Sequence, residues 1–282
     1  MYKRILSYTA VAGAFLVAGA AWAMPNIITA HLQTPGTEKT LLLPAAANHS
    51  PVISLGQAVD PTTGEVVEGY AIVHYKDAAA KSNGSRNKGP LCYGFLASGA
   101  KWKGTAEPWV VNPDNTRGLD PAAVYSGLGA DIAKWEDAAD GIVGNSSGIN
   151  ILGDGTITSS TLVADTAAPD GSNEVYFGSV SDPNTIAVTI VWGIFSGPSF
   201  QRKLVEWDQV YNEVDYDWSL SGNAGAMDFH NIATHELGHS VGLNDQYNSA
   251  CSAVTMYGYA GTGEANKQTL ETPDITGVST LY

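Results

Sequence analysis

Positive charge is scarce in this chain of 282 residues. Lysine and arginine number 14 against 28 aspartates and glutamates, which gives a formal net charge of -14 at pH 7. A protein that binds nucleic acid or an anionic membrane surface needs a basic patch, so this balance argues against both partners. It fits a secreted protein, a calcium binder or a protein that works in salt, and charge alone does not separate these three.

Several patterns of known chemistry are also missing. The chain has no internal repeat, no low-complexity tract, no Gly-rich phosphate loop and no Gly-x-Ser-x-Gly elbow. The only two cysteines do not lie in the pattern of a catalytic thiol. Beyond the N-terminus, no segment is apolar enough to cross a bilayer.

The N-terminus has the pattern of a targeting segment. Lys3 and Arg4 supply a positive region, residues 10–20 form an apolar run, and Ala21-Trp22-Ala23 fits a small-x-small cleavage site. The run is short for a membrane span, so an uncleaved anchor is the weaker alternative. We predict a signal peptide over residues 1–23 and a secreted, extracellular protein.

The most informative stretch reads His-Glu-Leu-Gly-His-Ser-Val-Gly-Leu-Asn-Asp over residues 235–245. On a helix, His235 and His239 leave the same face about one turn apart, a spacing that suits two nitrogen ligands on one zinc ion. Gly242 can take a positive φ, end the helix and turn the chain back toward the metal. Asp245 then arrives as the third ligand, and the fourth position stays open for water, as in catalytic zinc sites.

Other residues near this motif have different expected roles. The carboxylate of Glu236 can face the metal-bound water without being a ligand. Met256, within Val254-Thr255-Met256-Tyr257-Gly258, is typical of a Met turn. His230 lies five positions before His235, which rotates it away from the ligand face, so we interpret it as structural.

The region before residue 89 carries no catalytic pattern. Residues 52–55 and 70–75 read as strands joined by a turn over residues 60–65. The polar, basic stretch at residues 81–90 reads as a linker or exposed loop, and a processing protease could cut there. We therefore predict an N-terminal segment or pro-region over residues 24–88. Three histidines in it lack ligand spacing and are interpreted as surface residues: His31, His49 and His74.

Helices and strands alternate in the rest of the chain. Asp120 and Pro121 begin an amphipathic helix that runs to about residue 139. The strand predicted at residues 186–195 is apolar on both faces and therefore central in a sheet. A last helix is expected with Thr272 as its N-cap and Pro273 as its first residue. Further strands are predicted at residues 109–113, 174–178 and 204–211.

Four acids lie on or after the strand at residues 204–211: Glu206, Asp208, Asp215 and Asp217. Glu206 and Asp208 face outward in the predicted strand, and with Asp215 and Asp217 after it they could hold Ca²⁺. A solvated edge strand followed by a loop is the simpler interpretation, because the spacing of the oxygens matches no defined calcium loop.

The two cysteines, Cys92 and Cys251, have only each other as intrachain partners. Export implies an oxidising compartment, so we predict a disulfide between them. Closing so long a loop would stabilise the fold by on the order of 4–5 kcal/mol. The alternative is an inhibitory Cys92 thiolate on zinc, which would leave Cys251 unpaired.

On these motifs the chain resembles the metzincin metallopeptidases and is most similar to matrixin-like secreted microbial enzymes. The resemblance is carried by residues 207–219 and 231–243, by Thr255-Met256-Tyr257, and by residues 269–278 with Leu281-Tyr282. It implies a catalytic domain over residues 89–282 with an α+β fold: a twisted mixed sheet, an active-site helix, a Met turn and a C-terminal helix. Most metzincins have histidine where this chain has Asp245, whereas snapalysin-like enzymes are similar in using aspartate.

The resemblance implies a secreted zinc endopeptidase that acts as a monomer on proteins or peptides. His235, His239 and Asp245 would hold zinc, Glu236 would be the general base, and Met256 would form a floor under the metal. One alternative is a thermolysin-like site whose third ligand is Glu264 or Glu271. Another is a non-catalytic zinc-binding surface or adhesion module, against which the intact Glu236 argues.

Overall fold

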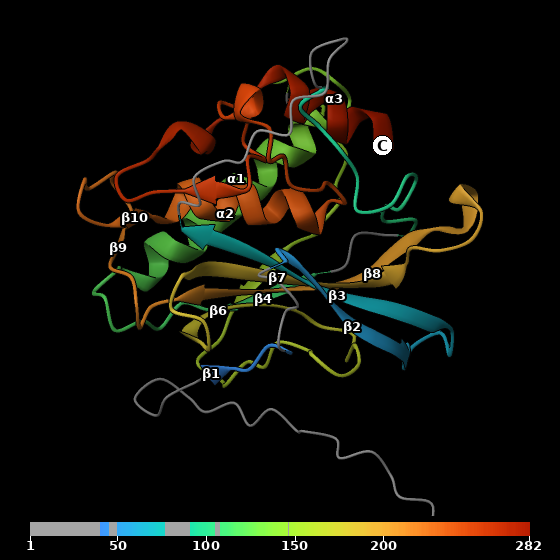
Figure 1. The fold of residues 1–282 in the computed structure, drawn as a ribbon, viewed down its shortest axis with the longest axis horizontal. Coiled ribbons are helices and arrows are strands. Elements are labelled where there is room, and N and C mark those ends of the chain that lie inside the picture. The colour runs from blue at the N-terminus through green and yellow to red at the C-terminus, as the bar shows by residue number, and fades with distance from the viewer. Residues whose placement is uncertain (1–39, 45–49, 77–90, 105–107, 146) are drawn as a thin grey trace, which may run out of the picture.

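A computed structural model describes residues 40–44, 50–76, 91–104, 108–145 and 147–282. Helices and a twisted, mixed nine-stranded sheet make up the fold, which confirms the predicted α+β class (Figure 1). The strands are β1 (Thr40–Leu41), β2 (Val52–Val59), β3 (Val66–Lys76), β4 (Trp109–Asn112), β5 (Gly155–Ile157), β6 (Asn173–Val180), β7 (Thr185–Ile194), β8 (Lys203–Asn212), β9 (Trp218–Ser219), β10 (Met227–Asp228) and β11 (Tyr259–Ala260). The α-helices are α1 (Pro121–Ala138), α2 (Phe229–Ser240) and α3 (Thr272–Leu281), and short 3-10 helices lie at Ser199–Gln201, Ser249–Cys251 and Asn266–Gln268.

The strand order explains which segments meet. Along the large sheet it is β11-β3-β7-β8-β6-β4-β5, with β2 added to β3 and β1 added to β6, while β9 and β10 form a separate pair. Strands β8, β6, β4 and β5 are parallel to one another, whereas β7 runs antiparallel to β8 and β3 antiparallel to β7. β7 thus lies inside the sheet, as its apolar sequence predicts.

Both faces of the sheet are covered. Helices α1 and α2 lie over one face in Figure 1 and share a hydrophobic core with it, which includes Trp135, Trp207 and Leu237. A smaller core on the opposite face includes Leu41 of β1, Trp192 and Val73. Burial on both faces accounts for the nearly continuous apolar sequence of β7.

The predicted N-terminal strands are present as β2 and β3. Asp60 organises the turn between them, because its carboxylate accepts hydrogen bonds from the Thr62 N–H and the Thr63 hydroxyl. β3 precedes residue 88 and pairs with β7, which follows it. The sheet therefore crosses the predicted boundary at residue 88, and the division into pro-region and catalytic domain stays a prediction.

Capping residues define the helix starts. Asp120 accepts a hydrogen bond from Ala122 N at the start of α1, as predicted. The N-cap of α3 is Glu271, and the prediction of Thr272 is wrong by one residue. The reason is a reciprocal capping box. The Glu271 side chain accepts a hydrogen bond from the backbone N–H of Asp274, and the Asp274 side chain accepts one from the backbone N–H of Glu271.

No helix within the described residues is both long enough and apolar enough to cross a bilayer. The predicted signal peptide at residues 1–23 lies outside the described part of the chain.

Candidate metal centre

Helix α2 presents its two histidines side by side. Asp228 caps its start by accepting a hydrogen bond from Asn231 N, and the ring centroids of His235 and His239 are 5.0 Å apart. The helix ends at Ser240 with Val241 as its C-cap, and Gly242, the next residue, has a φ of 105°, as predicted. A Cβ at position 242 would also lie 2.8 Å from Ala100 O. Both the positive φ and the lack of space therefore favour glycine here. The turn brings Asp245 back beside the histidines.

Three ligand atoms converge at this turn. Asp245 Oδ1 lies 3.1 Å from His235 Nε2 and 3.5 Å from His239 Nε2. All three atoms are buried, and none has a hydrogen-bond partner within the described residues. Ligands about 2.0–2.1 Å from a tetrahedral zinc ion lie roughly 3.3 Å from one another. The spacing and the unpartnered lone pairs therefore fit a zinc ion held by these residues.

The other atoms of the three candidate ligands are held in place by hydrogen bonds. His235 Nδ1 donates to Thr255 O at 2.7 Å, and His239 Nδ1 donates to Leu243 O at 3.0 Å. A carbonyl oxygen only accepts, so each Nδ1 carries the proton and each Nε2 of a neutral ring presents its lone pair. The Tyr247 hydroxyl donates to Asp245 Oδ2 at 2.6 Å, which turns Oδ1 toward the histidines.

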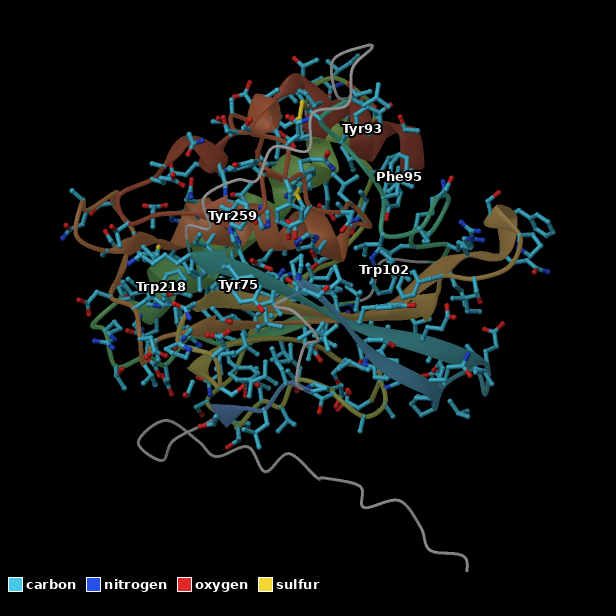
Figure 2. All side chains as sticks on the ribbon, in the orientation of Figure 1. Tyr75, Tyr93, Phe95, Trp102, Trp218 and Tyr259 are labelled. Atoms are coloured by element: carbon cyan, nitrogen blue, oxygen red, sulfur yellow. A yellow bond between two sulfur atoms is a disulfide. The ribbon has the colours of Figure 1, made fainter. Side chains whose placement is uncertain are left out.

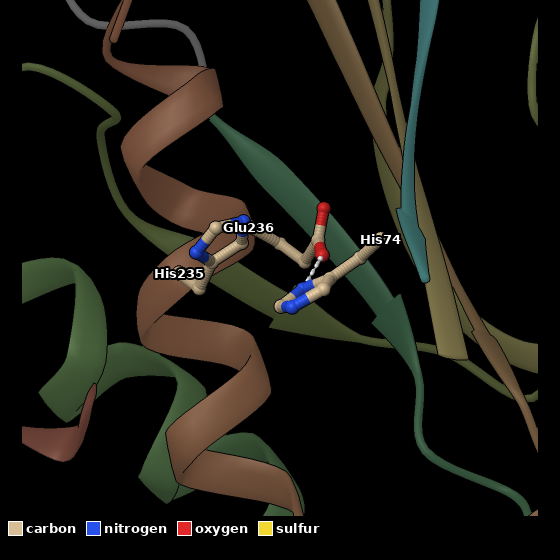
Figure 3. A group of neighbouring side chains, drawn as sticks. All are labelled: His74, His235 and Glu236. Atoms are coloured by element: carbon tan, nitrogen blue, oxygen red, sulfur yellow. Dashed lines mark hydrogen bonds and ion pairs between the residues drawn. The ribbon is translucent and has the colours of Figure 1, made fainter. Parts of the chain in front are cut away.

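Glu236 points from the helix toward the sheet. Thr189 Oγ1 on β7 donates to its Oε2 at 2.5 Å, and His74 Nδ1 on β3 lies 2.9 Å from its Oε1 (Figure 3). Burial raises the pKa of Glu236 to about 7. Burial, with His235 beside it, holds the pKa of His74 well below its ordinary value. A neutral His74 therefore faces the Glu236 carboxyl.

His74 lies far from its predicted place on the surface. It is 1 % exposed and lies at the centre, its ring centroid 4.0 Å from that of His235, so the prediction of a surface histidine is wrong. His31 and His49 lie outside the described residues. His230 is confirmed as structural, because its Nδ1 pairs with Asp131 Oδ2 on α1 at 2.9 Å. The sequence also does not predict the roles of Tyr247 and Thr189, because the fold brings them to Asp245 and Glu236.

The Met turn packs under the histidine helix. Met256 is fully buried, and a Cβ on Gly238 would lie 2.1 Å from its sulfur, so only glycine permits this contact. Asp274 of α3 accepts hydrogen bonds from Thr255 N at 2.9 Å and Met256 N at 3.2 Å. The C-terminal helix thereby fixes the turn that holds His235.

The alternative third ligands lie elsewhere. Glu264 is exposed, and Glu271 caps α3. Among the described residues, neither glutamate joins a cluster of possible metal ligands, whereas Asp245 does.

The predicted calcium acids are arranged differently from expectation. Glu206 and Asp208 are buried, not outward, because β8 is an inner strand. They cluster with Asp165, while Asp215 accepts a hydrogen bond from Asn212 and Asp217 pairs with Arg117. Burial raises the pKa of Glu206 to about 9 and that of Asp165 to about 6. Shared protons can thus neutralise the cluster, and calcium stays a prediction without further support.

The predicted disulfide is present. Cys92 and Cys251 are joined across a sequence separation of 159 residues. This finding removes the alternative of a free Cys92 thiolate on zinc.

Comparison with known proteins agrees with the geometry. The matrixin family model matches residues 200–282, a segment that contains α2, the three candidate ligands, the Met turn and α3. The resemblance predicted from the motifs is confirmed over this segment, and it supports a zinc metallopeptidase. No curated protein matches the chain. The finer likeness of Asp245 to snapalysin-like enzymes stays a prediction.

Proposed function

From the matrixin match and the geometry of the centre, we propose that this protein is a secreted, monomeric zinc endopeptidase. The observation that carries the proposal is the convergence of three buried ligand atoms that lack hydrogen-bond partners within the described residues. The carboxyl group of Glu236 lies on α2, the helix that carries the two histidines. His235, His239 and Asp245 would hold the metal. A zinc ion bound there supplies Lewis-acid chemistry, since it polarises a peptide carbonyl and lowers the pKa of water.

Glu236 is the proposed general base. Its Oε1 takes a proton from the attacking water and then delivers it to the leaving amine. A carboxyl group held beside the metal ligands suits both steps, because it can take up a proton and then release it. Thr189, bonded to Oε2, holds the carboxyl group in one orientation throughout.

A non-catalytic zinc-binding module is the alternative function. Such a module needs the three ligands but gains nothing from a carboxyl group buried beside them. Burial of an unneeded acid destabilises a fold, so the retained Glu236 favours the peptidase.

The test measures metal and turnover together. The full chain is expected to bind one zinc ion, counted by native mass spectrometry. Casein hydrolysis is measured with and without phenanthroline, before and after the protein chain is cut within residues 77–90. Glu236→Gln is expected to keep zinc and lose hydrolysis, while Asp245→Ala is expected to lose zinc. A chain that binds zinc but hydrolyses no casein, either before or after the cut within residues 77–90, would support the binding module. Loss of zinc in Glu236→Gln would contradict the role of Glu236 as general base.

A further inference from the structure

Lys267 is a buried cation without an acid partner. It is 1 % exposed, although lysine is almost never fully buried unless it is paired. Among the described residues, the lysines that form ion pairs are Lys134 and Lys203. Burial lowers the pKa of Lys267 to about 8, so the ammonium form still dominates at neutral pH. An unpaired buried charge destabilises a fold, and a function that needs an anion bound here would account for it.

The Lys267 ammonium group lies at the edge of the candidate metal centre. It donates to Tyr259 O on β11, and Nζ lies 3.5 Å from His74 Nε2. Figure 2 labels Tyr259 and Tyr75, which lie opposite each other where β11 pairs with β3. The backbone N–H of Lys267 donates to Asn231 Oδ1 at 2.7 Å, which ties the lysine to α2, the helix of the two histidine ligands. The charge therefore has a fixed position relative to those ligands.

One imidazole ring separates Lys267 from the reactive groups. The ring of His74 lies against that of His235, with the ring centroids 4.0 Å apart (Figure 3). Its Nδ1 faces Oε1 of Glu236 at 2.9 Å, and its Nε2 faces Lys267 Nζ. A neutral ring that donates from Nδ1 presents a lone pair at Nε2, which suits an ammonium donor. The space between Lys267 and the metal ligands is thus the size of one side chain, and an uncharged acceptor lies at its lysine end.

A carboxylate suits the lysine end of this space better than the neutral ring does. A glutamate side chain is about as long as that of histidine, so in this space its carboxylate reaches Nζ. An ammonium–carboxylate hydrogen bond is stronger than one to an uncharged acceptor. Glu236, which repels a carboxylate, contacts the opposite end of the ring. A carboxylate is therefore held beside Lys267, away from the proposed general base.

We propose that Lys267 forms a carboxylate-binding site, through which the protein selects substrates with a glutamate next to the scissile bond. The selected side chain would lie between His235 and Lys267, where the His74 ring lies in this structure. Selection of substrates rests on the proposed peptidase function, whereas binding of a carboxylate does not. The two parts are tested separately.

The first experiment measures carboxylate binding without turnover. His74→Ala in the full, zinc-free chain removes the ring beside Lys267, and engineered buried cavities bind small molecules that fit them. The metal is left out because it would itself bind acetate. Acetate should raise the melting temperature of His74→Ala in a saturable manner, and acetamide, its neutral analogue, should not. Equal effects of acetate and acetamide would overturn the proposal.

The second experiment measures selectivity in the zinc-loaded protein. The substrates are quenched fluorescent peptides that differ only by glutamate or glutamine at one of the two residues flanking the scissile bond. The intact chain and the chain cut within residues 77–90 are assayed, and the peptides are compared in each form that hydrolyses them. We expect kcat/KM to be about tenfold higher for glutamate on one side of the bond, the effect of one hydrogen bond to a charged group. Equal values on both sides would overturn the proposal.

Variants distinguish a binding role of Lys267 from a structural one. Lys267→Gln keeps a donor for Tyr259 O but removes the charge, so the preference for glutamate should disappear while the glutamine peptide is still hydrolysed. Lys267→Arg keeps the charge and should keep the preference. The control is Lys103→Gln, because Lys103 also donates to a backbone carbonyl, that of Phe200, but is exposed. A preference for glutamate that persists in Lys267→Gln would overturn the proposal.

Failure of the peptidase and failure of this site give different results. A protein that hydrolyses no peptide, but whose His74→Ala variant binds acetate and not acetamide, would refute the peptidase and support the carboxylate site. A protein that hydrolyses the glutamate and glutamine peptides equally would support the peptidase and refute selection by Lys267. Neither result requires a variant at position 267 to fold.

Discussion

Single residues around the three candidate ligands decide how firmly a metal is held. The Tyr247 hydroxyl donates to Asp245 Oδ2 and leaves Oδ1 facing the histidines. We predict that Tyr247→Phe weakens zinc affinity about tenfold, because loss of such an orienting hydrogen bond typically costs that much. Competition with a chromophoric chelator measures the change. Tyr257→Phe is the matched control, since the Tyr257 ring contacts Lys267 and its hydroxyl has no hydrogen bond to a ligand residue in the described part of the chain. An equal loss in both variants would contradict the role of Tyr247.

The sequence predicted those residues of the site whose geometry is local. His235 and His239 are one helical turn apart, and Gly242 returns the chain within three residues, so spacing alone places Asp245 beside them. His74 could not be predicted in this way. It precedes Glu236 by 162 residues and meets it only because β3 pairs with β7. Its position depends on strand register, which no local spacing encodes.

At the scale of elements, the Met turn depends on the start of α3. Asp274 accepts hydrogen bonds from Thr255 N, Met256 N and Glu271 N. We predict that Asp274→Ala lowers the free energy of unfolding by about 2–4 kcal/mol, since it leaves buried N–H groups without acceptors. Glu271→Ala, which removes only a capping side chain, should cost about 1 kcal/mol. Denaturant titration measures both, and a smaller loss in Asp274→Ala than in Glu271→Ala would contradict this account.

The acids of β8 give the fold a pH dependence. The folded-state pKa values of Glu206, about 9, and Asp165, about 6, lie above those of the unfolded chain. The unfolded state therefore loses its protons first, and the stabilisation present in acid is lost as pH rises toward 9. We predict that Glu206→Gln flattens the decline in melting temperature between pH 5 and 9 (about the range set by these pKa values).

The exposed Glu264→Gln is the control for Glu206→Gln and should keep the wild-type decline. Calcium enters the same experiment. If the cluster binds Ca²⁺, millimolar calcium should raise the melting temperature most at high pH, and Glu206→Gln should remove that effect. No calcium effect at any pH would refute the calcium prediction.

Element prediction succeeded where burial and capping act locally. The doubly apolar sequence of β7 and the Asp120 cap of α1 each indicate the observed element. The predicted outward orientation of Glu206 and Asp208 is wrong, because β8 is an inner strand and both acids are buried. Here the polar side chains are buried and cluster with Asp165, a long-range arrangement that the strand sequence does not reveal.

At the scale of the whole molecule, the disulfide braces the third ligand. The segment just after Cys92 pairs with the turn that leads to Asp245, through Leu96 N to Gly242 O and Asn244 N to Gly94 O. In the intact chain two covalent anchors precede this segment: the disulfide at Cys92 and the chain that leads back to β3. After a cut within residues 77–90, it lies close to a new N-terminus, and the disulfide is the remaining covalent anchor.

Loss of the disulfide should therefore have different effects in the two forms. We predict that Cys92→Ser with Cys251→Ser lowers the free energy of unfolding of the intact chain by on the order of 4–5 kcal/mol, measured by denaturant titration. In the chain cut within residues 77–90, the same change should also weaken zinc affinity, because the Gly94–Leu96 brace on the Asp245 turn can fray. Chelator competition on both forms, with and without the cysteines, tests this coupling. Equal zinc affinities in all four samples would show that the turn holds Asp245 without the brace.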